Sequence, residues 1–288
     1  MRFQLTEDQR ALRTGVRELL TRRFGPEQLR AAVEAPGRLQ KGLWRELGEA
    51  GFFALRLPED EGGVGLGLPE AVLVFEEAGR ALLPGPLVAT HVAAGAVPGA
   101  AEGTAVVTEV SPEGLLPWRD AADVVRGDAA GAVPVRSVDP LTPLHRVPGA
   151  GGAAESVTVL LTAAEQVGTA AWCTEAAVAY ARQREQFGQV IGGFQAVKHL
   201  CAGMLVRAEL ARAAVWAAAV TGDAVETAGA KLLADEAAVA NARDCLQVHG
   251  GMGFTWEADV HLHLKRAWVR AALVLPAGRA AEEVAAAL

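Results

Sequence analysis

The chain has 288 residues and 51% of them are hydrophobic, so it can bury a sizeable core in about two domains. Its formal net charge is −7 and it has no basic blocks, which argues against a nucleic-acid or anionic-membrane partner, because phosphate binding needs clustered positive charge. Three widely spaced cysteines, Cys173, Cys201 and Cys245, do not form a disulfide framework or a zinc motif. We expect small buried thiols in a reducing compartment.

The ends and apolar stretches of the chain give no targeting or spanning signal. Met1 leads into charged residues rather than an apolar run, which predicts no signal peptide. Residues 81–101 are apolar, but three prolines and a histidine interrupt them, so we expect no membrane-spanning helix there. The sequence therefore predicts a cytoplasmic protein.

Residues 1–99 have the pattern of a helical domain. Thr6 and Gln9 form a capping box before an apolar stripe, Gly51 stops a later helix, and Pro69 suits a first helical turn. The segment from Pro58 to Gly67 is rich in glycine and acids and is expected to be a loop. The helices predicted here begin after residues 6 and 26 and then span about 39–50, 70–82 and 87–96.

The sequence pattern changes at residues 100–157, where it predicts a reduced β region in place of helices. Short β-type runs at 105–108, 124–125 and 133–135 alternate with proline and glycine. The region is small for an independent domain, so we expect a small, irregular sheet.

Residues 158–288 predict a helix bundle. Apolar residues recur in steps of three and four from Val167 to Ala181 and from Val197 to Val215, and Leu232, Val239 and Leu246 repeat every seventh residue. Gly222 is expected to stop one helix, and Asp223 with Glu226 to cap the next as a capping box. Long helices with short joints indicate antiparallel packing.

The first joint, RQREQFGQVIGGFQ, runs from Arg182 to Gln195. Arg184 lies near the end of a long helix, and its guanidinium matches a phosphate or carboxylate. Phe187-Gly188 turns the chain, and the two glycines at 192 and 193 leave the backbone unshielded. The joint suits a diphosphate; the alternative is that the arginines only cap the helix and the glycines only form the turn.

The second joint, QVHGGMGFTWE, runs from Gln247 to Glu257. Gly250 and Gly251 allow a ligand to approach the backbone, but the cluster does not follow a strand and is not a dinucleotide fingerprint. His261 and His263 lie two residues apart and do not share a helical face, so we expect no metal site there.

These two joints, in this order, resemble the C-terminal signatures of the acyl-CoA dehydrogenase family. FQLTEDQRALRTGVRELL near the start and LPEDEGGVGLGLPEAVLVFEEAGR after it resemble the same family's opening helical domain. The resemblance implies a mainly α fold with an N-terminal helical domain, a middle β region and a C-terminal four-helix bundle, divided here at 1–99, 100–157 and 158–288. It also implies FAD at a subunit interface and α,β-dehydrogenation of an acyl-CoA thioester, in which a carboxylate takes the α-proton and flavin N5 the β-hydride.

The resemblance also assigns roles to residues of this chain. Arg184 is expected to bind the FAD diphosphate, Phe187 to pack beside the cofactor, and Gln195 to support that joint. Gln247, Gly250 and Gly251 are expected to receive the ADP portion of a flavin seated mainly on a neighbouring subunit.

Two departures from the family pattern concern the catalytic base. The motif spacing places the usual base at Val274 and the alternative base at Thr158, and neither residue is a carboxylate. The middle region is also shorter than the family's β domain. Both departures predict a subunit that completes the FAD site while a second acyl-CoA dehydrogenase-like chain supplies the base, as in heteromeric enzymes acting on steroid side chains.

Two other hypotheses stay open at this stage. The chain is either a self-sufficient flavoenzyme with a relocated base, for which Glu165 and Glu257 are the candidates, or a flavin-free structural or regulatory homologue. The sequence does not determine the acyl group, and a steroid-derived thioester rests on family analogy.

Overall fold

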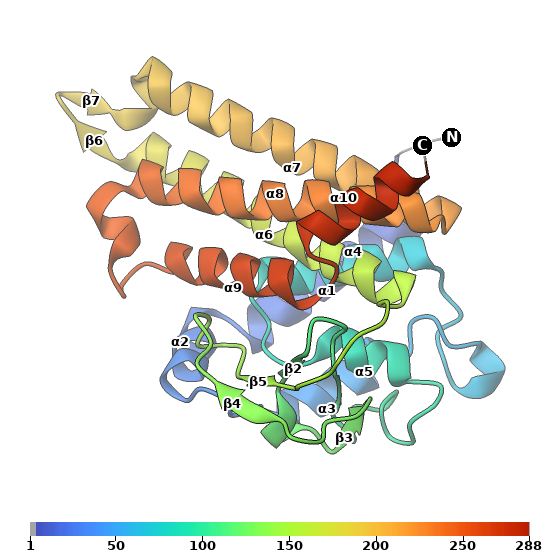
Figure 1. Cartoon of the computed structure of the whole chain (residues 1–288). Helices are drawn as coiled ribbons and strands as arrows, with labels where there is room; N and C mark the ends of the chain where they lie inside the picture. Colours follow the sequence, from blue (N-terminus) through green and yellow to red (C-terminus); the bar gives the residue numbers. More distant parts are fainter. Residues whose placement is uncertain (1–3, 288) are drawn as a thin grey trace.

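The computed structural model describes residues 4–287, and most of these are helical (Figure 1). The helices are α1 (Glu7–Arg23), α2 (Pro26–Glu34), α3 (Lys41–Glu49), α4 (Leu68–Arg80), α5 (Leu87–Ala93), α6 (Ser156–Gln183), α7 (Gln195–Thr221), α8 (Ala224–His249), α9 (Val260–Leu273) and α10 (Ala277–Ala286). The strands are β1 (Val107–Glu109), β2 (Leu115–Pro117), β3 (Val124–Arg126), β4 (Val133–Val135), β5 (Leu144–Arg146), β6 (Glu185–Gln186) and β7 (Gln189–Val190).

The mainly α fold predicted from the sequence is confirmed, with helical N-terminal and C-terminal parts around a small strand region. One helix is shorter than expected, since α5 ends at Ala93 rather than near residue 96. Among residues 4–287, no helix is both long enough and apolar enough to cross a membrane. The domain limits and the cytoplasmic location stay predictions.

The predicted capping box is present in full at the start of α1, whereas at the start of α8 only one of its two hydrogen bonds forms. Thr6 and Gln9 exchange both hydrogen bonds of the capping box of α1. The carboxylate of Asp223 accepts from the backbone N–H of Glu226 and caps α8. The Glu226 carboxylate does not return a bond to Asp223; it accepts from the hydroxyl of Thr221 instead, so the predicted capping box is only an N-cap. Gly222 ends α7 with φ 68°, as glycine allows.

The C-terminal bundle consists of α6, α7, α8 and α9, with α10 packed on α8. The predicted stripes of α6 and α7 are buried or half-buried, as expected. On α8 the seven-residue stripe also packs as expected, with Leu246 buried and Leu232 and Val239 half-buried against buried clusters, and buried alanines complete the seam. Small side chains let the helix backbones approach closely.

The strand region is small and irregular, as the sequence predicted. β1 pairs with β3 in parallel, and β5 pairs antiparallel with both β2 and β4. A buried ion pair attaches this region to the bundle: Arg266 of α9 contacts Asp139 and donates to the carbonyl oxygens of Leu83 and Leu141, each at 3.2 Å. One guanidinium therefore holds together the bundle, the end of the N-terminal domain and the strand region.

Two glycines let the N-terminal domain pack directly on the bundle. Gly79 of α4 lies against the backbone of Glu165, and Gly168 of α6 lies against the backbone of Glu76. A Cβ atom at either position would collide with the carbonyl oxygen of the other helix. Only glycine permits this crossing, which fixes the distance between α4 and α6.

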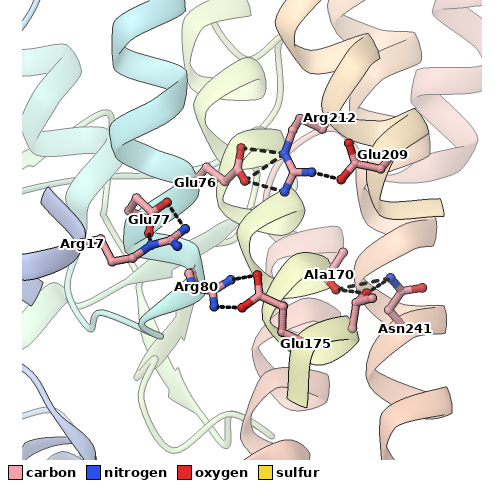
Figure 2. A network of polar contacts seen from close by, with 10 residues as sticks. Arg17, Glu76, Glu77, Arg80, Ala170, Glu175, Glu209, Arg212 and Asn241 are labelled. Atoms are coloured by element: carbon pink, nitrogen blue, oxygen red, sulfur yellow. Dashed lines mark hydrogen bonds and ion pairs between the residues drawn. The ribbon is translucent and has the colours of Figure 1, made fainter. Parts of the chain in front are cut away.

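Arginine–glutamate pairs flank that crossing (Figure 2). Arg17 of α1 binds Glu77 of α4 through two nitrogens, one of them at 2.8 Å. Arg212 of α7 lies between Glu76 and Glu209, with one nitrogen 2.8 Å from Glu76. The Glu76 and Glu77 side chains are almost fully buried, so their charges depend on these arginines. The pairs connect α1 and α7 to α4.

We predict that Gly168→Ala lowers the free energy of unfolding by about 3 kcal/mol or more, because overpacking at a helix crossing forces the backbones apart. The matched control is Gly229→Ala on α8, where no atom lies within 4 Å of the added Cβ. That control should raise stability by about 0.5–1 kcal/mol, since alanine favours helix. Urea denaturation measures both; equal effects would contradict the close crossing.

A second prediction concerns acid stability. Burial lowers the pKa of His91 on α5 to about 4. Between this pKa and the usual pKa of about 6.5, His91 is protonated in the unfolded chain and neutral in the folded chain. Stability should fall as pH drops from about 6.5 towards 4, by about 3 kcal/mol from this residue. His91→Gln should remove that part of the loss, so the free energy of unfolding should change by about 3 kcal/mol less between pH 7 and 4. Urea denaturation at a series of pH values measures it. A variant curve parallel to the wild type would contradict it.

Candidate functional site

The first joint forms a β-hairpin between α6 and α7. Arg184 ends α6, and β6 and β7 pair across the two-residue turn Phe187-Gly188. Both turn residues have positive φ, 53° and 80°, as a type I′ hairpin turn requires. The Phe187 side chain is 92% exposed, which is unusual for an aromatic ring held in a strained conformation. The sequence indicated a turn here but not the hairpin.

The second joint connects α8 to α9 through a 3₁₀ turn from Gly250 to Phe254. Gly250 ends α8 with φ 60°, and no atom lies within 4 Å of where a Cβ would stand at Gly250 or Gly251. Gln247, two residues before the end of α8, is exposed. The backbone of this turn is therefore open to a ligand.

The two joints lie at the same end of the bundle, on the left in Figure 1. The rings of Tyr180 on α6 and His249 on α8 stack with centroids 4.2 Å apart. His249 Nδ1 lies 2.8 Å from the carbonyl oxygen of Cys245, where an N–H donates and fixes the ring. Sequence analysis missed this stack, because Tyr180 and His249 belong to different motifs and no local spacing connects them.

The first joint is rich in unpaired donors. Arg184 is exposed, and within residues 4–287 no carboxylate lies within ion-pair distance of it. Gln195 is exposed as the first residue of α7, and no side chain caps that helix. Uncapped N–H groups and the helix dipole favour an anion beside the guanidinium. The geometry thus fits a diphosphate in charge and in donors.

The structure corrects the reading of the glycines in the first joint. A Cβ at Gly192 would stand 2.8 Å from the carbonyl oxygen of Ala181, and one at Gly193 would stand 3.0 Å from the Gln189 side chain. Gly192 is therefore needed for packing against the end of α6, whereas Gly193 is exposed and its nearest neighbour is the end of the flexible Gln189 side chain. Glycines with no atom within 4 Å of an added Cβ occur at the second joint.

The two residues at the expected base positions face one cavity at a different place in the fold. Thr158 at the start of α6 and Val274 after α9 both line a cavity of about 260 Å³ between α5, β1, β2 and the bundle. They are distant in sequence, and only the folded chain brings them together.

The sequence models of the acyl-CoA dehydrogenase N-terminal and C-terminal domains match residues 6–109 and 157–284. The chain is 37% identical to acyl-CoA dehydrogenase IpdE2 of Mycobacterium tuberculosis, over 91% of each protein. The chain belongs to the acyl-CoA dehydrogenase family. This confirms the resemblance seen in the sequence, and places the chain among oxidoreductases.

Two solved structures have the same fold. One is a variant of the Tcur3481-Tcur3483 steroid acyl-CoA dehydrogenase, with a TM-score of 0.84, 25% identity and 97% coverage of both chains. The other is the ChsE4-ChsE5 complex from Mycobacterium tuberculosis, with a TM-score of 0.81, 24% identity and coverage of 100% of this chain and 98% of the other.

The candidate relocated bases are poorly placed for proton transfer. Glu165 lines the cavity, but its carboxylate binds Arg270 at 2.8 Å and both side chains are buried. Burial lowers the pKa of Arg270 to about 10, and the Glu165 carboxylate acts in the opposite direction. Glu257 is exposed at the second joint and does not line the cavity. Glu165 therefore has a structural partner that competes with any role as a base.

We predict that Glu165→Gln lowers the free energy of unfolding by about 3 kcal/mol, because it leaves the buried Arg270 without a counter-charge. The matched control is Glu175→Gln on the same helix, whose partner is Arg80 and whose side chain is 60% exposed. That change should cost less than about 1 kcal/mol. Thermal unfolding of both variants measures the difference; a neutral Glu165→Gln would show that the pair is not structural.

Proposed function

We propose that this chain is the base-less subunit of a heteromeric, FAD-dependent acyl-CoA dehydrogenase, and that it contributes the ADP and diphosphate half of the FAD site. One observation carries the proposal: the unpaired Arg184 and the open backbone at Gly250 occur at one end of the bundle. The two positions of the family's catalytic base face one cavity, and they are occupied by Val274 and Thr158 rather than by a carboxylate. Binding and proton transfer are thus separated in this chain.

Each residue of the joints has a distinct role in this proposal. The Arg184 guanidinium binds the diphosphate with charge-assisted hydrogen bonds, and Phe187 packs beside the cofactor. Gln195 supports the first joint at the start of α7. Gln247, Gly250 and Gly251 receive the ADP portion, where the missing Cβ atoms let phosphate oxygens reach the backbone. The exposure of all six residues supports a ligand that lies on another subunit.

The partner chain supplies what this one lacks. FAD, when bound, accepts a hydride from the acyl-CoA in this family. Valine carries no titratable group, and threonine ionises too weakly to remove an α-proton at neutral pH. A general base contributes roughly 100- to 10,000-fold to a rate, so the reaction requires a carboxylate from a second acyl-CoA dehydrogenase-like chain.

Exposed apolar side chains support assembly with such a partner. Phe187, Phe254 and Trp256 project from the two joints with 92%, 72% and 62% of their area exposed. Val206 and Leu210 lie four residues apart on one face of α7, each more than half exposed, and Leu205 lies beside them. Large apolar groups gathered at one place mark interaction surfaces. Two proteins of the same fold, Tcur3481-Tcur3483 and the ChsE4-ChsE5 complex, consist of paired chains, which favours a heteromer over a homo-oligomer.

The substrate is an acyl-CoA thioester, and a steroid-derived thioester is the first to test. The Tcur3481-Tcur3483 relative is described as a steroid acyl-CoA dehydrogenase. The substrate-contacting base lies on the partner, so the acyl group is selected largely outside this chain.

We predict that Arg184→Ala weakens FAD binding by the complex about tenfold or more, since a hydrogen bond to a charged group contributes roughly 1.5–3 kcal/mol. The matched control is Arg182→Ala, which removes an exposed arginine two residues earlier and should leave flavin content unchanged. The measurement is the flavin-to-protein ratio of the chain co-expressed with an acyl-CoA dehydrogenase-like partner encoded beside it, together with acyl-CoA oxidation.

Two outcomes would contradict the proposal. Full FAD occupancy in a homo-oligomer of this chain, with turnover, would favour the self-sufficient flavoenzyme. Absence of flavin from the chain in complex with every candidate partner would favour a flavin-free structural or regulatory homologue.

A further inference from the structure

Two cysteines that lie far apart in the sequence meet inside the bundle, near the end that carries the two joints. Cys173 is on α6 and Cys245 is on α8, and both side chains are fully buried in one apolar cluster at this end. Both are free thiols. The proposed flavin site uses neither of them.

The packing of α6 against α8 brings the two thiols together. The side-chain amide of Asn241 on α8 donates to the Thr174 hydroxyl on α6 at 3.1 Å. Cys173 directly precedes Thr174, and Cys245 follows Asn241 by one helical turn. Both cysteines therefore belong to the same contact between the two helices, and they share one buried cluster.

Cys245 has the surroundings of a reactive thiol. Its sulfur lies 3.7 Å from Nδ1 of His249, which follows one turn later on α8. The neighbouring Cys173 thiol lowers the pKa of Cys245 to about 6, with a further contribution from this imidazole and against the effect of burial. Burial raises the pKa of Cys173 instead. At neutral pH the pair therefore combines a nucleophilic thiolate with a thiol.

The approach to Cys245 leads through the second joint. His249 ends α8 and is half-buried, so its ring lies between the buried sulfur and the glycine turn. No atom lies within 4 Å of where a Cβ would stand at Gly250 or Gly251, which leaves space beside the ring. An oxidant of a few atoms can pass the ring, whereas a bulky disulfide reagent is excluded. The burial of the pair thus selects a small oxidant.

We propose that Cys173 and Cys245 are a redox-sensitive modification site, at which hydrogen peroxide converts the two thiols into a disulfide that joins α6 to α8. The Cys245 thiolate attacks one peroxide oxygen and the O–O bond breaks, which leaves a sulfenic acid on Cys245. The hydroxide released takes up the proton that Cys245 had lost and becomes water.

The second step closes the disulfide. The sulfur of Cys173 attacks the sulfur of Cys245, and the S–O bond of the sulfenic acid breaks. The departing hydroxide takes the Cys173 proton and leaves as water. In total, two thiols and one peroxide give one disulfide and two waters, and the two electrons lost by the sulfurs reduce the peroxide.

The cross-link changes the end of α8 beside the second joint. As the Cys245 sulfur turns towards α6, His249 Nδ1 loses its contact with that sulfur and keeps only the Cys245 carbonyl oxygen. His249 stacks on Tyr180 and directly precedes Gly250. The disulfide should therefore weaken binding of the ADP portion of FAD. This consequence rests on the proposed function, whereas the disulfide itself does not.

The first test exposes the chain, in complex with its partner, to hydrogen peroxide at pH 7 and maps the cysteines by mass spectrometry. Trypsin places the three cysteines of this chain in three different peptides. The expected product links the Cys173 and Cys245 peptides, is about 2 Da lighter than their sum, and separates on reduction with dithiothreitol. Two thiols that stay reduced while free cysteine is oxidised, or a link that includes Cys201, would overturn the proposal.

Three serine variants locate the reaction. Cys245→Ser should abolish both the sulfenic acid and the linked product, and Cys173→Ser should leave a sulfenic acid on Cys245 that does not resolve. The matched control is Cys201→Ser, a half-buried cysteine on α7, which should leave the linked product unchanged. If a serine variant does not fold, alanine replaces serine at that position, since buried alanines line the same cluster.

A fourth variant tests the activation of Cys245. His249→Phe keeps an aromatic ring to stack on Tyr180 and removes Nδ1, so it should slow disulfide formation at pH 7 about tenfold or more, because less of the Cys245 thiol is ionised. The control is His199→Phe, an exposed histidine on α7. An unchanged rate in His249→Phe would remove this histidine from the proposal.

Flavin content separates this inference from the proposed flavin site. The oxidised complex should bind FAD about threefold or more weakly than the reduced complex, in the range of one lost hydrogen bond, and dithiothreitol should restore binding. Cys173→Ser should retain its FAD under the same treatment. A disulfide that forms without any change in FAD binding would overturn the regulation only. A reduced complex without flavin would contradict the proposed function, and the mass measurement decides the disulfide in either case.

Discussion

The contact between α4 and α6 is the constraint on which the rest of the structure depends. Gly79 and Gly168 let the two backbones touch, so the N-terminal domain packs on the bundle without an intervening layer of side chains. Glu165, whose backbone lies at this crossing, also binds Arg270 through its carboxylate. The same crossing therefore sets the spacing of α4 from α6 and positions one wall of the cavity.

Buried charge is handled by pairing throughout the molecule. Lys231 and Asp235 bind each other inside the alanine-rich seam, and Gln166 donates to Asp235 at 2.8 Å. Burial lowers the pKa of Lys231 and raises that of Asp235, while their mutual attraction acts against both shifts. Such pairs impose specific partners on helices whose alanine faces would otherwise slide, because leaving one charge unpaired is expensive. The same kind of pairing engages the two acids that line the cavity, Glu109 with Arg126 and Glu165 with Arg270.

The proposed function separates cofactor binding from proton transfer. Within residues 4–287, Arg184 at the end of the bundle is exposed and has no ion-pair partner, whereas the acids beside the cavity are engaged with arginines. An enzyme that carries its own base needs a carboxylate free to accept a proton. The arrangement is consistent with a subunit that binds part of a cofactor and leaves the chemistry to its partner.

Much of this was determined by the sequence. The capping box at Thr6, the stop at Gly222 and the helical stripes depend on neighbours a few residues apart, and they predicted the helices and the two joints well. The lack of a carboxylate at Val274 is likewise a property of the sequence. Only the tertiary structure decided that Thr158 and Val274 share a cavity, that Glu165 is paired with Arg270, that Tyr180 stacks on His249, and that Gly192 is needed for packing. The physical reason is that local spacing fixes backbone hydrogen bonds and the buried face of each helix, whereas contacts between distant residues follow from how closely whole helices pack.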